Sequence, residues 1–367
     1  MNMTMKYQGE VIYVYAYDLA YEMRKLPIRE ILGQPVAQFM VDSSKRSPKH
    51  LFFYKPQMVR LPSTERIGPK GTVRVERTVK LLPVGAISIT VKVPFEVNRI
   101  EELVDYHDLQ FTNGSLQDEV RALAEQVRQE LLSYCIRPVP NLADEEAYTV
   151  FCIKSPVYLE GKPIGTTDWL KNNRRKVAAL LTEETDTAKL SEQEVEESTG
   201  RFLSYYEHDL VVTDWNAALI IDNNFDETLY ALELANLQLA ELEAYDRILD
   251  DALDRSYRDM VASSMRGKNR MLHELRELRI DLARCSDELS NITKFFGDYH
   301  LAHVYEQIAQ RFHLADWHKT IDNKLKTLDN LYMMLVSERN NYWMLMLEIT
   351  IVLLFVVDVI VLLLGIK

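Results

Sequence analysis

Cysteine is scarce in this 367-residue sequence, and its three copies form no recognisable motif. Cys135, Cys152 and Cys285 lie far apart, and no CxxC pair occurs. An odd, sparse set of cysteines is typical of a reducing compartment, and it argues against a disulfide framework or a cysteine zinc site. We therefore expect a protein that folds without disulfides.

The motifs of common catalytic and nucleotide-binding sites are also lacking. The twelve glycines are scattered, with no GxGxxG and no GxxxxGK[ST], and neither GxSxG nor HExxH occurs. These motifs supply the backbone amides, nucleophiles and metal ligands on which their chemistry depends. We therefore predict no catalytic residue and no cofactor.

Residues 1–10 lack a basic region followed by an apolar run, so they resemble neither a secretory signal nor an arginine-rich transit peptide. We expect the body to stay on the side of the membrane where it is made. The formal net charge of −12 argues against DNA binding over the whole surface. One compact basic cluster stands out, Arg266, Lys268 and Arg270. It is either a hairpin tip suited to phosphate on lipid or RNA, or a set of scattered charges on a continuous helix.

The C-terminus carries a long apolar run, Tyr342 to Ile366. As a helix it spans roughly 37 Å, enough for a hydrocarbon layer of about 30 Å. Fifteen Leu, Ile, Val or Phe residues from Ile349 onward favour insertion by roughly 4 to 9 kcal/mol, and a central aspartate opposes it by about 3. Tyr342 and Trp343 stand where interfacial aromatics are expected. The alternative is a buried core helix, which usually carries a polar stripe.

The charges of this run are Glu348 and Asp358, with Lys367 just beyond it. An acid at the depth of Asp358 is by default a functional hypothesis, because an unpaired charge in lipid is costly. Asp358 either hydrogen-bonds a polar group on a second copy or a partner helix, or is simply protonated and tolerated by the bilayer.

The pattern of the chain predicts an α+β fold with a β-rich body, long coiled-coil-like helices and one C-terminal transmembrane helix. Residues 1–140 form a β-rich region, in which Val11 to Tyr17 alternates with a period of two and Thr72 to Val93 contains a hairpin. A short helix is expected before Pro27. Ser115 and Ser191 each precede an acid by three residues, which is a helix-start signal.

Residues 141–224 form an α/β segment, with a strand near 147–154 and paired strands around Thr213–Asn216. Residues 225–341 contain no proline between Asp226 and Asn341, so long helices are expected before the span at 342–366. Two heptad stripes run along them; the first is Met271, Leu275, Leu278, Leu282, Cys285, Leu289 and Ile292, and the second is Ile321, Leu325, Leu328, Tyr332 and Leu335. Either stripe can pack within the chain or against another copy.

His300 and His303 are the best metal candidates, because an i,i+3 pair places both imidazoles on one helix face. No third ligand has a recognisable spacing, and helix-packing histidines are far commoner. We expect no metal.

Four segments carry a family resemblance: FFGDYHLAHVYEQIAQRF (Phe295 to Phe312), KLKTLDNLYMMLVSERNN (Lys324 to Asn341), LEITIVLLFVVDVI in the apolar tail, and YYEHDLVVTDWNAALIID (Tyr205 to Asp222). Over roughly residues 200–367 they resemble the "required for meiotic nuclear division" family, which includes a yeast sporulation protein and a mitochondrial inner-membrane relative. The resemblance implies an α/β body, long C-terminal helices, a terminal membrane helix and no known catalysis. The mitochondrial relative is regarded as an oligomer that holds the translation machinery near the membrane. The lack of a transit peptide fits a bacterial homologue.

The leading hypothesis is a non-enzymatic, tail-anchored scaffold that oligomerises and recruits a protein or ribonucleoprotein partner to the bilayer. Its bulk is expected in the cytoplasm, at a bacterial inner membrane. The alternative is a membrane-associated metal-dependent hydrolase with a site around His300 and His303. A third possibility is that the protein is part of a transport complex in which Asp358 takes part. A single span could do this only as an oligomer.

Overall fold

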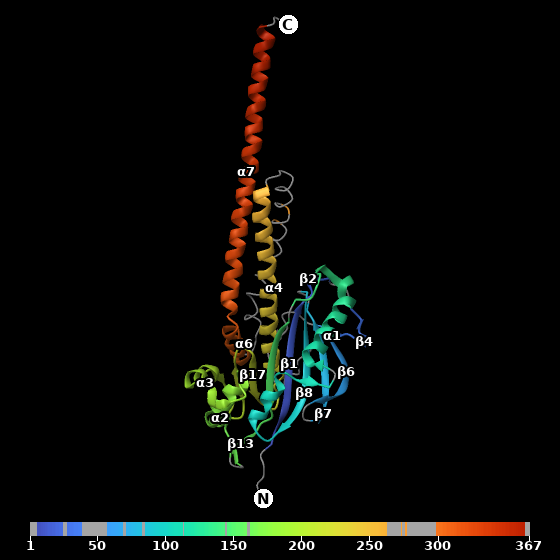
Figure 1. Ribbon diagram of the computed structural model, residues 1–367, viewed down its shortest axis with the longest axis vertical. Coiled ribbons are helices and arrows are strands. Elements are labelled where there is room, and N and C mark those ends of the chain that lie inside the picture. Colours follow the sequence, from blue (N-terminus) through green and yellow to red (C-terminus); the bar gives the residue numbers. More distant parts are fainter. Residues whose placement is uncertain are drawn as a thin grey trace. The chain divides into compact units, whose positions relative to one another are not determined.

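The computed structural model describes residues 6–24, 28–38, 57–68, 71–82, 85–112, 114–143, 145–159, 162–262, 273, 276 and 299–363 (Figure 1). The chain divides into two compact units, one of residues 1–244 with 290–315 and the other of residues 245–289 with 316–367. The first unit holds the sheet and the second holds long helices, which confirms the predicted α+β class.

A mixed nine-stranded sheet organises the described part of the first unit, in the order β15-β16-β17-β12-β1-β8-β7-β6-β5. The bounds are β1 (Tyr7–Asp18), β5 (Ala37–Gln38), β6 (Gln57–Gly68), β7 (Gly71–Leu81), β8 (Ala86–Val97), β12 (Glu146–Ile153), β15 (Phe202–Leu203), β16 (Leu210–Thr213) and β17 (Ala217–Ile221). Its pairs are antiparallel except for β12 with β17. The sheet thus draws strands from both sides of residue 140.

Smaller elements connect these strands: β2 (Ala20–Met23), β3 (Glu30–Ile31), β4 (Gln34–Pro35), β9 (Gln110–Phe111), β10 (Gly114–Ser115), β11 (Cys135–Pro138), β13 (Val157–Leu159), β14 (Lys162–Ile164) and the 3-10 turns η1 (Ile100–Tyr106), η2 (Leu132–Tyr134) and η3 (Thr187–Lys189). The short helix expected before Pro27 is wrong, because β2 pairs with β11 there. Gly85 permits the close approach behind this pairing. It has a φ of +92°, and an added Cβ would lie 1.9 Å from the Ala20 carbonyl oxygen.

The period-two pattern of β1 predicts a strand correctly, but both of its faces are buried. Its tyrosines share one core with α1 (Leu116–Leu131) and α2 (Thr166–Leu181). The opposite face of the sheet holds Ser88 and Thr90 of the neighbouring strand β8. Their hydroxyls contact Glu233 of α4 (Asp226–Ala262). Helices therefore cover both faces, so the alternation separates two cores rather than core from solvent.

The predicted helix starts are confirmed where a serine lies three residues before an acid. The Ser115 side chain accepts a hydrogen bond from the Asp118 amide at 3.0 Å, before α1. The Ser191 side chain accepts one from the Glu194 amide at 3.1 Å, before α3 (Glu192–Thr199). Each bond satisfies an amide that the first helical turn leaves unpaired.

The long helices are α4, α6 (Tyr299–Arg311) and α7 (Leu314–Leu363). In the first unit, residues 228–242 of α4 are buried all around, and Tyr305 of α6 donates a hydrogen bond to Gln238. In the second unit, Lys324 of α7 lies 2.6 Å from Asp246 and 2.7 Å from Asp250 of α4. Of the second predicted stripe, Ile321 and Leu328 are buried. The first stripe, from Met271 to Ile292, lies outside the described residues.

Two cysteines, Cys135 and Cys152, are free and buried in the described structure. Burial raises the pKa of both thiols above the ordinary value. The thiolate is the reactive form, so these side chains are chemically inert core residues. Cys285 lies outside the described residues.

His107 gives the body a defined response to acid. Its Nε2 lies 2.6 Å from the Leu180 carbonyl oxygen, and burial lowers the pKa of the imidazole. A lowered pKa means that the unfolded chain gains its proton first, so the contribution of His107 to stability is constant well above pH 6.5 and falls below it. We expect the unfolding free energy to decrease from pH 7.5 to 5.5, by at most about 1.4 kcal/mol per pH unit from this one group. Urea unfolding of the detergent-solubilised chain measures this slope.

His107→Gln should flatten the acid limb, whereas the exposed-loop variant His208→Gln should leave it unchanged. Equal slopes for wild type and His107→Gln would contradict the assignment.

Candidate functional site

The C-terminal part of α7 is an exposed apolar helix. Its most apolar 18-residue window has a mean hydropathy of 2.8, and none of that window is buried. Tyr342 and Trp343 at its start are 42% and 64% exposed. In the described structure, α7 is therefore the helix that is long and apolar enough to cross a membrane. The helix runs without a break from Leu314 into the apolar tail.

Glu348 and Asp358 are exposed on this apolar part of α7. The Thr350 hydroxyl donates a hydrogen bond to the Met346 carbonyl oxygen of the same helix, at 2.8 Å. Glu348 and Asp358 are thus the charged residues of this apolar part.

The metal candidates His300 and His303 both lie on α6. The His300 ring packs 5.6 Å from the ring of Tyr205, as a helix-packing histidine does. No three His, Cys, Asp or Glu side chains within the described ranges are placed to hold a metal ion. The basic cluster Arg266, Lys268 and Arg270 lies outside those ranges.

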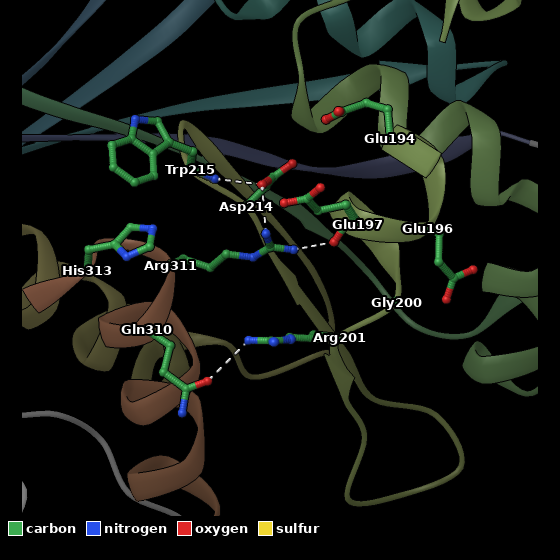
Figure 2. Close-up of a pocket in the computed structure, with 10 residues that line it drawn as sticks. All are labelled: Glu194, Glu196, Glu197, Gly200, Arg201, Asp214, Trp215, Gln310, Arg311 and His313. Atoms are coloured by element: carbon green, nitrogen blue, oxygen red, sulfur yellow. Dashed lines mark hydrogen bonds and ion pairs between the residues drawn. The ribbon is translucent and has the colours of Figure 1, made fainter. Parts of the chain in front are cut away.

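A pocket of about 720 Å³ lies on the first unit, and its lining comes from three separated segments of the chain. These are the end of α3 and its following loop, the β16–β17 turn, and the end of α6 (Figure 2). The lining residues are Glu194, Glu196, Glu197, Gly200, Arg201, Asp214, Trp215, Gln310, Arg311 and His313. We call it the Trp215 pocket. Its volume is within the range of small-molecule and side-chain recognition sites.

The framework of the Trp215 pocket is an ion pair held by aromatic packing. Arg311 Nη1 lies 3.7 Å from Asp214 Oδ1, and the guanidinium also donates to the Glu197 carbonyl oxygen (Figure 2). Tyr148 donates to the Asp214 carbonyl oxygen at 2.9 Å and packs edge-on against Phe312, with ring centroids 5.2 Å apart. These contacts fix the strand turn to the end of α6.

The rim of the pocket presents an aromatic and charged surface. Trp215 is 54% exposed, and its ring lies 5.8 Å from that of His313. Arg201 donates a hydrogen bond to Gln310 Oε1 at 3.3 Å (Figure 2). Partly exposed Trp and Arg side chains are the types that most often dominate binding energy at protein interfaces. The arrangement suits recognition of another molecule.

Sequence reasoning missed the Trp215 pocket. Trp215 lies in the predicted strand pair, but Arg201 and Arg311 are 110 positions apart and belong to no motif. The one available signal was a tryptophan beside Asp214 and Asn216, in a turn where a core residue is unexpected.

The structure defines a class of protein, an α+β body continued by a helix that is long and apolar enough to span a membrane. The chain belongs to the family described as "Uncharacterized protein MJ0711, N-terminal domain", whose profile matches residues 8–227. It is similar to "Uncharacterized protein MJ0711" of the archaeon Methanocaldococcus jannaschii, with 26% identity over 337 residues, 90% of this chain and 97% of the relative.

These comparisons overturn the resemblance to the "required for meiotic nuclear division" family. The family match covers the sheet-bearing body, residues 8–227, whereas the resemblance rested mainly on the helices and the apolar tail after residue 200. Heptad stripes and apolar spans satisfy generic packing and solvation demands. Unrelated chains share them, so they carry little information about family.

Proposed function

We propose that the protein is a non-enzymatic, C-terminally membrane-anchored scaffold that assembles as an oligomer and recruits a protein or ribonucleoprotein partner. The observation that carries the proposal is the exposed apolar part of α7, in which none of the most apolar window is buried. A core helix would be covered by its own protein. A bilayer supplies the missing apolar environment.

The charges that flank the helix support an orientation with the body in the cytoplasm. Lys324, Lys326 and Arg339 precede the apolar part of α7, and basic residues favour the cytoplasmic side of a span. The membrane in this proposal is therefore the cytoplasmic membrane.

The Trp215 pocket supports partner binding by the body. Trp215 lies on the same described unit as Tyr205 and Tyr206, which are 61% and 56% exposed. Large aromatic side chains that remain in water gain free energy when a partner covers them. Arg201 at the rim adds a donor for polar recognition.

Affinity purification of the full-length protein from detergent-solubilised membranes tests the proposal. We expect a discrete partner to co-elute with the wild type and its recovery to fall about tenfold or more with Trp215→Ala, as for an interface anchor. Tyr257→Ala is the matched control, because Tyr257 is an aromatic of α4 with 48% exposure.

Equal recovery with Trp215→Ala and wild type would remove the pocket from the proposal. A full-length protein that elutes alone, with nothing bound, would contradict recruitment itself.

A further inference from the structure

The two acids of the apolar helix lie on one face of it. Glu348, Ile351, Phe355, Asp358 and Leu362 follow one another with spacings of 3, 4, 3 and 4 residues. At about 100° per residue these five positions fall within an arc of about 80° on an α-helix. The spacing is that of a heptad seam, which packs against a second helix with a small left-handed crossing. We call these five residues the acidic seam.

The acidic seam has an energetic reason to be covered. A charged side chain at the centre of a span opposes insertion by about 2.5 to 3.5 kcal/mol, and polar groups in lipid are almost always paired. Within residues 342–363 the other hydrogen-bonding side chains are few, and Thr350 is already bonded to its own helix. The described part of α7 therefore offers Asp358 no side-chain donor, and a second helix can supply one.

We propose that the acidic seam is the interface between parallel copies of this chain in the membrane, where the Asp358 carboxyl groups hydrogen-bond each other through a shared proton. The inference rests on the proposed membrane anchoring and names the partner of that helix. Copies inserted in the same direction hold Asp358 at the same depth, so symmetry alone brings the two carboxyl groups together.

The seam itself favours a second copy over a foreign basic helix. Its apolar members Ile351, Phe355 and Leu362 repeat at the spacing that a parallel copy would match residue for residue. A parallel copy also carries Asp358 at the same position of its own span, so the pair needs no further polar residue in the helix.

Association of the full chain in liposomes tests the inference. Donor and acceptor fluorescent proteins are fused before Met1, and energy transfer in phosphatidylcholine vesicles is followed as lipid is added. We expect Asp358→Leu to weaken association about 5- to 30-fold, the range for one hydrogen bond between membrane helices. Asp358→Asn should stay within about twofold of wild type, because an amide pair also hydrogen-bonds.

A position control separates the seam from mere polarity. Ile360 lies about 160° around the helix from Asp358, on the side opposite the acidic seam. Asp358→Leu combined with Ile360→Asp therefore moves the acid to the opposite face at nearly the same depth. We expect this double variant to associate as weakly as Asp358→Leu.

Unchanged energy transfer with Asp358→Leu would overturn the seam. An Asp358→Asn variant as weak as Asp358→Leu would overturn the hydrogen-bonded pair of Asp358 side chains. Carbonate extraction of each variant keeps the two proposals distinct. Protein that leaves the vesicles disproves the anchor, whereas protein that stays but does not associate disproves the seam alone.

Discussion

Deletion of residues 342–367 will release the protein from membranes into the soluble fraction. The fifteen large apolar residues from Ile349 onward, set against one central aspartate, leave about 1 to 6 kcal/mol in favour of insertion. This corresponds to roughly 5-fold to 10⁴-fold partitioning into the bilayer. Ultracentrifugation after alkaline carbonate treatment measures it, with full-length protein in the pellet and truncated protein in the supernatant.

Point variants make the same test without shortening the chain. Two arginines, Val352→Arg with Val356→Arg, add about 5 to 7 kcal/mol against insertion and should abolish pelleting. Val352→Leu with Val356→Leu keeps the segment apolar and should pellet like wild type. Full-length protein that stays monodisperse in the supernatant without detergent would refute the anchor.

Glu233→Ala will destabilise the body by about 3 to 5 kcal/mol, because it leaves a buried lysine without its counter-ion. Lys80 and Glu233 are 7% and 4% exposed and form an ion pair between β7 and α4. Ser88 also donates to Glu233 Oε1 at 2.5 Å. The loss is a large fraction of the 5 to 15 kcal/mol by which domains are commonly stable. Urea unfolding of the full chain in detergent, followed by tryptophan fluorescence, measures it.

A double variant identifies the mechanism. Lys80→Met with Glu233→Leu removes both charges and should recover at least half of the lost stability, since apolar pairs often replace buried ion pairs at little cost. Asp226→Ala on the same helix is the control. Its partner Lys92 is 3.6 Å away and both side chains are partly exposed, so we expect a change below about 1 kcal/mol. A Glu233→Ala effect as small as that of Asp226→Ala would contradict the buried-pair account.

Several elements were predictable because their causes are local. Ser115 and Ser191 each cap a helix with their own side chain, and a cap depends on residues three positions apart. The hairpin of β7 and β8 was also predictable, because alternating β-branched residues flank the turn signals Pro83 and Gly85. The uninterrupted course of α7 also has a local cause, because neither proline nor glycine occurs from Leu314 to Leu363.

Other features depended on long-range pairing. Residues 20–23 form β2 rather than a helix because β11, more than a hundred positions away, pairs with them. The parallel pairing of β12 with β17 leaves no mark on either strand, since both read as apolar runs. The family resemblance failed for a related reason, because repetitive helices and apolar spans look alike in unrelated chains.

By itself, the sequence determined the fold class and the apolar C-terminal helix, because local periodicity and summed hydrophobicity are properties of contiguous residues. The tertiary structure alone decided the two cores on either side of β1, the buried pair of Lys80 with Glu233, and the Trp215 pocket. Each of these brings together side chains from distant segments. Their meeting is fixed by strand order and helix packing, which no short stretch of sequence encodes.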